Sequence, residues 1–198
     1  MADLARPGVV AVAGSRALPA SAAPLVASVC RSVLASGRSL AVGCATGADA
    51  LVLSAGLPPS AVRCFAAFGP GAFGPLGACS LSAVSAVAAH VRSGGSVRWW
   101  AGGGLGVPLG VRLANRTRAV VAEASAGCVV FFATPLSQGS ALAASLAAGR
   151  GMPVFAFPVG FPGRLLPAIG PGQWAPFDEG AGPWAGAFRW VPAPGLLS

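Results

Sequence analysis

Short apolar runs alternate with segments of helical length through most of this chain. Strands are predicted at the runs Gly8–Ala13, Ser39–Val42, Ala61–Ala67, Val97–Trp100, Val129–Ala133 and Val154–Phe157. Helices are predicted between them at Ala22–Ala35, Ala48–Ala55, Leu81–Val91 and Arg112–Ala124, and across the Ala-rich segment before the last strand. Apolar strands about 25 residues apart, each followed by a helix, are typical of an α/β fold with a mainly parallel sheet.

The stretch from Gly127 to Pro158 is the most informative part of this pattern. It reads as a strand, a small-residue loop at Pro135–Ser140, an Ala-rich helix and a second strand, which together make a βαβ unit. A βαβ crossover makes its strands parallel and points the helix N-terminus at the carboxyl edge of the sheet. Unpaired N–H groups and the positive end of the helix dipole gather there, so we expect this loop to bind an anion.

Beyond Gly160 the alternation ends. Residues 161–198 are rich in Gly, Pro and Trp and follow neither a helix period nor a strand period. We expect residues 1–160 to form one α/β domain and residues 161–198 to form an extension that packs on it as an irregular cover. The aromatic residues expected to make that contact are Trp174, Phe177, Trp184, Phe188 and Trp190.

The amino-acid composition adds information about the charge of the protein and the kind of partner it suits. The chain has 198 residues and a net charge of +8, and all 13 of its cationic residues are Arg. Lys and Tyr are absent while Ala, Gly, Pro and Val abound, and these residues share GC-rich codons, so a coding bias accounts for the missing Lys. The bias does not explain the shortage of Asp and Glu. The basic charge therefore remains compatible with a phosphate-bearing or nucleic-acid partner.

The same composition bears on location and redox state. No segment reads as a membrane span, because the long uncharged stretches are interrupted by Gly-Pro pairs or by the Pro135 loop. Asp3 and Arg6 precede Pro7 without an apolar core, which argues against a secretory signal. The 5 Cys form no Cys-x-x-Cys pair and mostly lie in or beside apolar runs. We therefore expect buried free thiols, a cytoplasmic protein, no metal site and no cofactor.

The turn after the first predicted strand contains Gly14, Ser15 and Arg16. Glycine lets the backbone bend sharply there, Ser15 offers a hydroxyl and amides, and Arg16 can bind a phosphate or a carboxylate. A Gly-Ser dipeptide is also common in loops that bind nothing. By itself this turn is therefore weak evidence for phosphate binding, and it becomes a candidate only together with similar turns after other strands.

The turn after the second predicted strand contains Gly43, Thr46 and Gly47 and leads to Asp49 in the first helical turn. Asp49 would bind a ribose hydroxyl or loop amides, or would act with Thr46 in capping the helix. Between Ala50 and Phe177 the only acid is Glu123, and this scarcity favours a functional role for Asp49.

The third element is Asn115-Arg116, and the fourth is the run Ser137, Gln138, Gly139 and Ser140. Asn115 is the only Asn in the chain, which indicates either an orienting contact to phosphate or a cap for the helix. Ser137 or Ser140 would cap the helix after the last loop, and free amides would hold phosphate.

In this order, the four elements resemble the SLOG superfamily of Rossmann-like proteins, which includes DprA (Smf), the LOG phosphoribohydrolases and the YspA-like proteins. Gly14-Ser15-Arg16 looks like the GSR of the family's first strand, and the spacing from Gly43 to Asp49 is similar to its GxxxGxD. Asn115-Arg116 looks like its RN pair, and Ser137–Ser140 followed by Val154–Pro158 looks like the SGS…VFAVPG of DprA. The resemblance covers roughly residues 8–160 and implies a three-layer Rossmann-like fold with a mainly parallel sheet.

Departures from the family are as informative as the matches. LOG enzymes carry PGGxGTxxEE, whereas Leu142 and Ala143 stand in the window where that acidic pair would lie. Cleavage of a nucleotide N-glycosidic bond by that mechanism is therefore disfavoured. Full-length DprA proteins flank the core with small domains for which this chain has little room.

Three hypotheses follow from these observations. The first is binding of a nucleotide or nucleotide-derived ligand as a sensor or ligand-binding protein, with phosphate on the glycine turns, Arg16, Asn115 and Arg116 orienting it, and Asp49 on the sugar. The second is DprA-like binding of single-stranded DNA on an Arg-lined face. The third is N-glycosidic hydrolysis with Asp49 or Glu123 as the catalytic acid. The sequence does not determine the oligomeric state and is compatible with a homo-oligomer.

Overall fold

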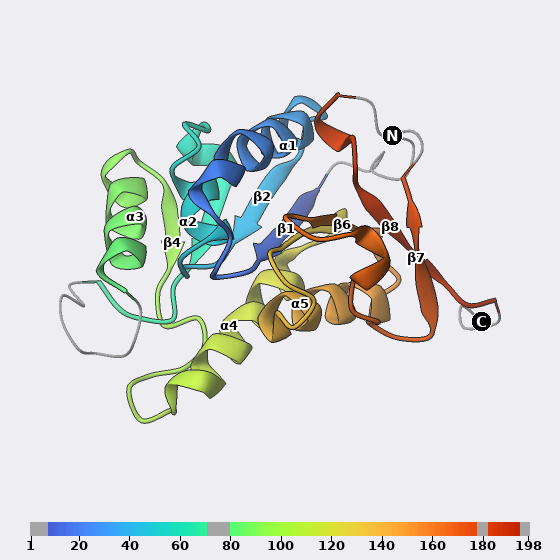
Figure 1. Ribbon diagram of the computed structural model, residues 1–198. Helices are drawn as coiled ribbons and strands as arrows, with labels where there is room; N and C mark the ends of the chain where they lie inside the picture. The colour runs from blue at the N-terminus through green and yellow to red at the C-terminus, as the bar shows by residue number, and fades with distance from the viewer. Residues whose placement is uncertain (1–7, 71–79, 178–181, 195–198) are drawn as a thin grey trace.

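The computed structural model describes residues 8–70, 80–177 and 182–194, and in this part of the chain one eight-stranded sheet forms the centre (Figure 1). The strand order is β4-β3-β2-β1-β5-β6-β8-β7. The strands are β1 (Val9–Gly14), β2 (Ser39–Val42), β3 (Val62–Phe65), β4 (Ser96–Arg98), β5 (Gly127–Phe132), β6 (Val154–Pro158), β7 (Gly172–Pro176) and β8 (Phe188–Pro192). Neighbours from β4 to β6 pair in parallel, and β8 pairs antiparallel with both β6 and β7.

Helices cover both faces of the sheet and complete three layers (Figure 1). One face carries α1 (Ala23–Ala35), α2 (Ala48–Leu53) and α3 (Leu81–Arg92), and the other carries α4 (Leu109–Glu123) and α5 (Gln138–Gly149). Short 3-10 turns are η2 (Ala20–Ala22), η3 (Pro59–Ala61), η4 (Gly163–Leu165) and η5 (Gly182–Trp184). The predicted three-layer Rossmann-like architecture with a mainly parallel sheet is confirmed. No helix among the described residues is both long and apolar enough to cross a membrane.

The apolar pattern explains why these elements form. All six residues of β5 are buried, as expected for a central parallel strand covered on both faces. Helix α1 buries Val26, Val29 and Val33 at helical spacing. Helix α5 buries Ala143, Ala144 and Ala147 on one face, so a surface of small side chains packs against β5.

The chain reverses its direction across the sheet between β1 and β5. From β1 the crossovers run outward through β2 and β3 to β4, and α4 then carries the chain back so that β5 pairs on the other side of β1. Open α/β sheets bind ligands at the carboxyl ends of the strands that flank such a switch point. The turns after β1 and β5 are therefore where the fold places a site.

The expected irregular cover is wrong, because the segment beyond Gly160 extends the sheet. The strand β8 pairs with β6 through Phe155↔Arg189 and Ala156↔Phe188, and β7 then pairs with β8. The expected aromatic contact with the domain does form at Trp184, which is 4% exposed. Its ring centre lies 5.2 Å from that of Phe155, and its Nε1 donates to Ser32 Oγ at 3.0 Å.

Several predicted boundaries are displaced by one or more residues, while Ser39–Val42 is confirmed residue for residue. The fourth strand is Ser96–Arg98 and not Val97–Trp100, because the backbone turns at Trp99 and Trp100, the latter with a φ of 53°. The helix expected from Arg112 begins at Leu109, directly after Pro108, which has an extended conformation.

Candidate functional site

Hydrogen bonds join the turns after β1 and β5 at the switch point. The amide of Ser15 donates to the carbonyl oxygen of Phe131 at 2.8 Å, and the amide of Ala133 donates to Ser15 Oγ at 2.9 Å. The hydroxyls of Ser15 and Ser137 also hydrogen bond to each other. Two serines that are 122 positions apart in the chain thus meet where the fold favours ligand binding.

The turn after β2 packs directly against this junction. The amide of Ala48 donates to the carbonyl oxygen of Ser15 at 3.2 Å, and Thr46 Oγ1 donates to the carbonyl oxygen of Arg16 at 3.3 Å. Gly47 has a φ of 67°, and a Cβ there would lie 2.2 Å from the oxygen of Ser15. Gly47 therefore permits the close packing of the two turns, and Gly14 does the same against β5, where a Cβ would lie 2.6 Å from the Phe131 oxygen.

Asp49, in the first turn of α2, is buried and is paired with a residue of α4. Its Oδ2 accepts hydrogen bonds from the amide of Ala45 and from Nη1 of Arg116, both at 2.9 Å. The side chains of Arg116 and Asp49 are only 9% and 5% exposed. A Cβ at Gly43 would lie 1.5 Å from Arg116 Nη1, so the guanidinium lies where any larger residue would put its side chain. The structure thus joins Asp49 and Arg116 in one internal ion pair, for which Gly43 leaves room.

The two acids proposed for hydrolysis are not brought together. Glu123 ends α4, about 10 Å along the helix axis from Arg116, and it pairs with Arg63. Burial raises the pKa of the Asp49 carboxyl, while Arg116 and the amide of Ala45 favour its charged form and oppose the shift. Among the described residues no three His, Cys, Asp or Glu side chains gather as metal ligands would.

Asn115 holds the loop that precedes α4. Its Nδ2 donates to the carbonyl oxygen of Gly102 at 3.3 Å, and its Oδ1 accepts from Arg118 Nη1 at 3.0 Å. Both ends of the amide are therefore engaged within the protein. Its contacts position the Gly102 loop against the helix.

The first turn of α5 is the open part of the site. The N-cap residue Ser137 makes no side-chain hydrogen bond to the first turn of the helix. Gln138 and Gly139 are exposed, and no atom lies within 4 Å of a Cβ built at Gly139. Ser140 is 2% exposed, and its Oγ has no hydrogen-bond partner. Free amides and the positive end of the dipole suit this turn to an anion.

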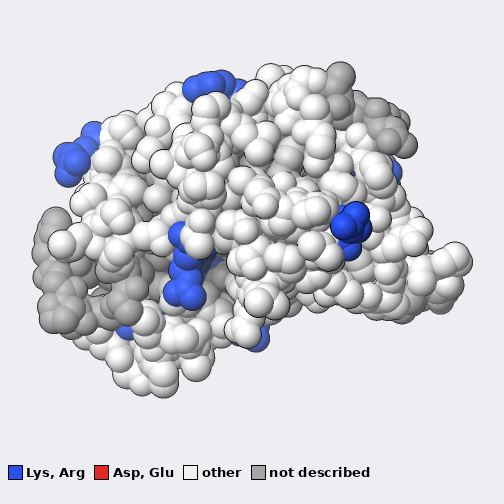
Figure 2. Space-filling model, viewed as in Figure 1, with Lys and Arg blue, Asp and Glu red and all other residues white. Residues whose placement is uncertain are grey.

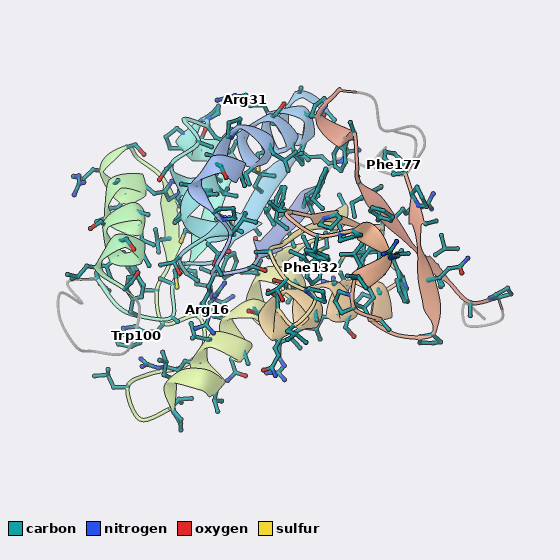
Figure 3. The ribbon with its side chains drawn as sticks, viewed as in Figure 1. Arg16, Arg31, Trp100, Phe132 and Phe177 are labelled. Atoms are coloured by element: carbon teal, nitrogen blue, oxygen red, sulfur yellow. The ribbon has the colours of Figure 1, made fainter. Side chains whose placement is uncertain are left out.

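Positive charge lies beside this turn, and no unpaired acidic side chain among the described residues offsets it. Arg16 is exposed, and Figure 2 shows blue side-chain atoms in a hollow at the place where Figure 3 labels this residue. The carboxylates of the described residues are those of Asp49 and Glu123, and both are ion-paired. Among the described residues, an anion at this edge of the sheet thus meets a cation and no unpaired carboxylate.

Arg112, which lies one helical turn before Arg116, was not among the predicted site residues. It is 4% exposed, its Nη1 is 3.4 Å from the carbonyl oxygen of Ala67, and its Cζ lies 5.9 Å from the ring centre of Trp100. Its Nε has no hydrogen-bond partner. The i, i+4 spacing of two arginines between apolar residues was the available signal, because such residues lie on one helix face.

Comparisons with known proteins agree on the fold. No protein-family model and no curated protein sequence shows significant similarity to the chain. Among solved structures it is similar to DNA processing protein A from Helicobacter pylori, for which a single-stranded DNA binding mode is described, with 19% identity and a TM-score of 0.57 over 80% of this chain and 69% of that one. It is also similar to DprA from Streptococcus pneumoniae, with 23% identity and a TM-score of 0.57 over 80% of this chain and 53% of that one.

These similarities show that the chain has the Rossmann-like fold of the DprA proteins. The resemblance read from the four turns is therefore confirmed at the level of the fold.

Proposed function

We propose that this protein binds single-stranded DNA along the carboxyl edge of its sheet, with a backbone phosphate on the first turn of α5. The observation that carries the proposal is the pairing of an uncapped helix N-terminus with the exposed Arg16 across the Ser15–Ser137 contact. Amides bind the phosphate oxygens there and the guanidinium supplies charge. The DprA fold supports this assignment, because the H. pylori protein of that fold binds single-stranded DNA.

The overall charge supports a polyanionic partner. The net charge is +8, and the two described carboxylates are internally paired. Every cation is an Arg, which keeps its charge up to high pH and binds phosphate with two parallel hydrogen bonds. Counterions released from the strand then contribute most of the affinity.

The test is binding of a fluorescently labelled oligothymidylate of about 16 nucleotides, measured by anisotropy at several salt concentrations. The affinity is expected to fall steeply with salt, and Arg16→Ala is expected to weaken binding and to reduce the slope of log K against log[salt] by about 0.7. Arg92→Ala is the matched control, because Arg92 is an exposed residue in the last turn of α3, toward the opposite edge of the sheet. Binding that ignores salt, or equal effects of the two substitutions, would contradict the proposal.

A second candidate is a nucleotide or nucleotide-derived ligand, with the protein as a sensor or ligand-binding protein. The buried Oγ of Ser140, which has no partner, favours it, because a terminal phosphate on the first turn of α5 would offer that hydroxyl an acceptor. Mass spectrometry of small molecules that co-purify with the protein tests this idea. A nucleotide that protects the protein against thermal unfolding and competes with oligothymidylate would make it the better assignment.

We further infer a cytoplasmic location. Cys30, Cys44, Cys64 and Cys128 are buried free thiols, as expected for a reducing compartment. Cys79 lies outside the described residues. A homo-oligomer stays a prediction, and light scattering with and without DNA would test it.

A further inference from the structure

The C-terminal extension builds a second pocket, which none of the four sequence motifs includes. It lies between η4 and the β7–β8 hairpin and has a volume of about 470 Å³, within the range of small-molecule sites. We call it the hairpin pocket and define it by Gly163, Arg164, Leu166, Trp174, Phe188 and Trp190. The segment with η4 follows the carboxyl end of β6, the same edge of the sheet as the first turn of α5.

Its wall is a set of aromatic rings that contact one another. Trp174 and Trp190 are cross-strand partners, as are Pro176 and Phe188, so the four side chains lie on one face of the hairpin. The two indoles meet edge to face with their centres 5.2 Å apart and an angle of 70° between the rings. The indole Nε1 of Trp174 donates to the carbonyl oxygen of Pro167 at 2.8 Å, which fixes the orientation of that ring. A wall held in place before binding costs a flat ligand little ordering entropy.

The basic residue Arg164 lies at the edge of the hairpin pocket. A Cβ at Gly163 would lie 1.9 Å from the Phe188 ring, so η4 rests directly on that ring and brings Arg164 to the pocket. Arg164 is exposed and makes no hydrogen bond or ion pair with another described residue. Figure 2 shows blue atoms over η4, where Arg164 is the one basic residue.

We propose that the hairpin pocket binds a nucleobase against the Trp174 and Trp190 rings, with Arg164 on the adjoining phosphate. This inference rests on the proposed function, since it makes the pocket a stacking subsite for a strand whose backbone lies on the first turn of α5. Every base has a flat π-face, so such a subsite accepts any sequence. The positive rim favours an anionic ligand over the neutral proline-rich peptides that also bind aromatic grooves.

The experiment uses thymidine 5′-monophosphate and, as its base-free counterpart, 2-deoxyribose 5-phosphate, with NMR detection of the tryptophan indole N–H signals. The Trp174→Phe variant assigns the Trp174 signal and keeps an aromatic ring in the wall. Thymidine monophosphate is expected to shift the Trp174 and Trp190 signals, whereas the base-free sugar phosphate leaves them in place. Arg164→Ala is expected to weaken thymidine monophosphate binding about tenfold, and Arg92→Ala is expected to leave it unchanged.

The outcomes separate this inference from the proposed function. If oligothymidylate binds in an Arg16-dependent way while the indole signals stay still and Arg164→Ala changes nothing, the pocket is not a base subsite and the proposed function survives. If thymidine monophosphate shifts the indoles but no oligonucleotide binds, the proposed function fails and the pocket remains a nucleotide site. Indole shifts caused by a proline-rich peptide and by no nucleotide would overturn the inference.

Discussion

Arg116 and Asp49 form a buried ion pair, with 2.9 Å between Nη1 and Oδ2, that ties α4 to the turn after β2. The guanidinium fills the space above Gly43, and the carboxylate also holds the amide of Ala45. The pair therefore shapes the carboxyl edge of the sheet from within. Contacts to a ligand are left to groups that face outward, above all Arg16 and the first turn of α5.

Removing one member of this pair should destabilise the protein strongly. Arg116→Ala leaves the Asp49 carboxylate buried without its cation, which is expected to lower the free energy of unfolding by about 3–5 kcal/mol in urea titrations. Arg116→Met combined with Asp49→Asn removes both charges and should cost much less. Equal losses for the single and the double variant would show that packing, and not charge, dominates.

The same variant should be less impaired in acid. Without Arg116, nothing offsets the effect of burial as strongly, and the pKa of Asp49 in the folded protein rises further. Between the pKa of the unfolded chain and this higher value, the folded protein holds a proton that the unfolded chain has lost. The stability of Arg116→Ala relative to the parent is therefore expected to rise as the pH falls below neutrality toward the ordinary pKa of Asp, about 3.9. Urea unfolding of both proteins across this interval measures the difference.

Two glycines of the predicted site should respond to alanine in opposite ways. The Cβ of Gly43→Ala would lie 1.5 Å from Arg116 Nη1, so the ion pair must move, and we expect a loss of about 3 kcal/mol. Gly139→Ala meets no atom within 4 Å and lies in the first turn of α5, so its stability should be unchanged or higher by about 0.5 kcal/mol. Thermal unfolding of both variants checks the contrast, and a destabilised Gly139→Ala would refute it.

The buried hydroxyl of Ser140 should matter for binding and not for folding. Because its Oγ has no partner, Ser140→Ala is expected to keep or raise the free energy of unfolding, by up to about 1 kcal/mol. If phosphate binds at the first turn of α5, the same variant weakens oligothymidylate binding. A destabilised variant with normal binding would mean that the hydroxyl serves only the fold.

Alkaline pH should weaken the fold through its thiols. Burial raises the pKa of Cys30, Cys64 and Cys128 from 9.0 to about 12. Between these values the unfolded chain has lost thiol protons that the folded protein keeps, so the free energy of unfolding falls as the pH rises, by about 1.4 kcal/mol per pH unit for each thiol.

Few other groups obscure this effect, because the chain has no Lys and no Tyr. Urea unfolding under reducing conditions from about pH 8 to about pH 11 measures the slope, and Cys128→Ala should reduce it by roughly a third. A flat profile would show that the thiols ionise in the folded protein.

Local pattern was enough to predict most of the core. Short, largely apolar runs located β1, β2, β3, β5 and β6, because central parallel strands are buried on both faces. The strands β7 and β8 were not predicted, since Gly, Pro and Trp break any period of two. Pro176 is nonetheless compatible with β7, because an edge strand need not donate every amide to a neighbour.

The sequence located the turns of the candidate site but not the contacts of their side chains. Gly14, Gly43 and Asp49 were expected to face a ligand, and each instead makes an internal contact with residues far along the chain. Such contacts depend on how α4 crosses the sheet, which no local period encodes. The hairpin pocket was not predicted for the same reason, because Trp174 and Trp190 come together only through the pairing of β7 with β8.

The pairing of β6 with β8 also sets the order in which the protein can finish folding. On the ribosome, β1 to β6 are made before the strand that covers the outer edge of β6 exists. Until Phe188–Pro192 emerges, the apolar Val154–Phe157 run presents unpaired amides and carbonyls to other nascent chains. Aggregation during synthesis should thus depend on how quickly the last strands follow, and slow translation after Pro158 would lengthen the period of risk.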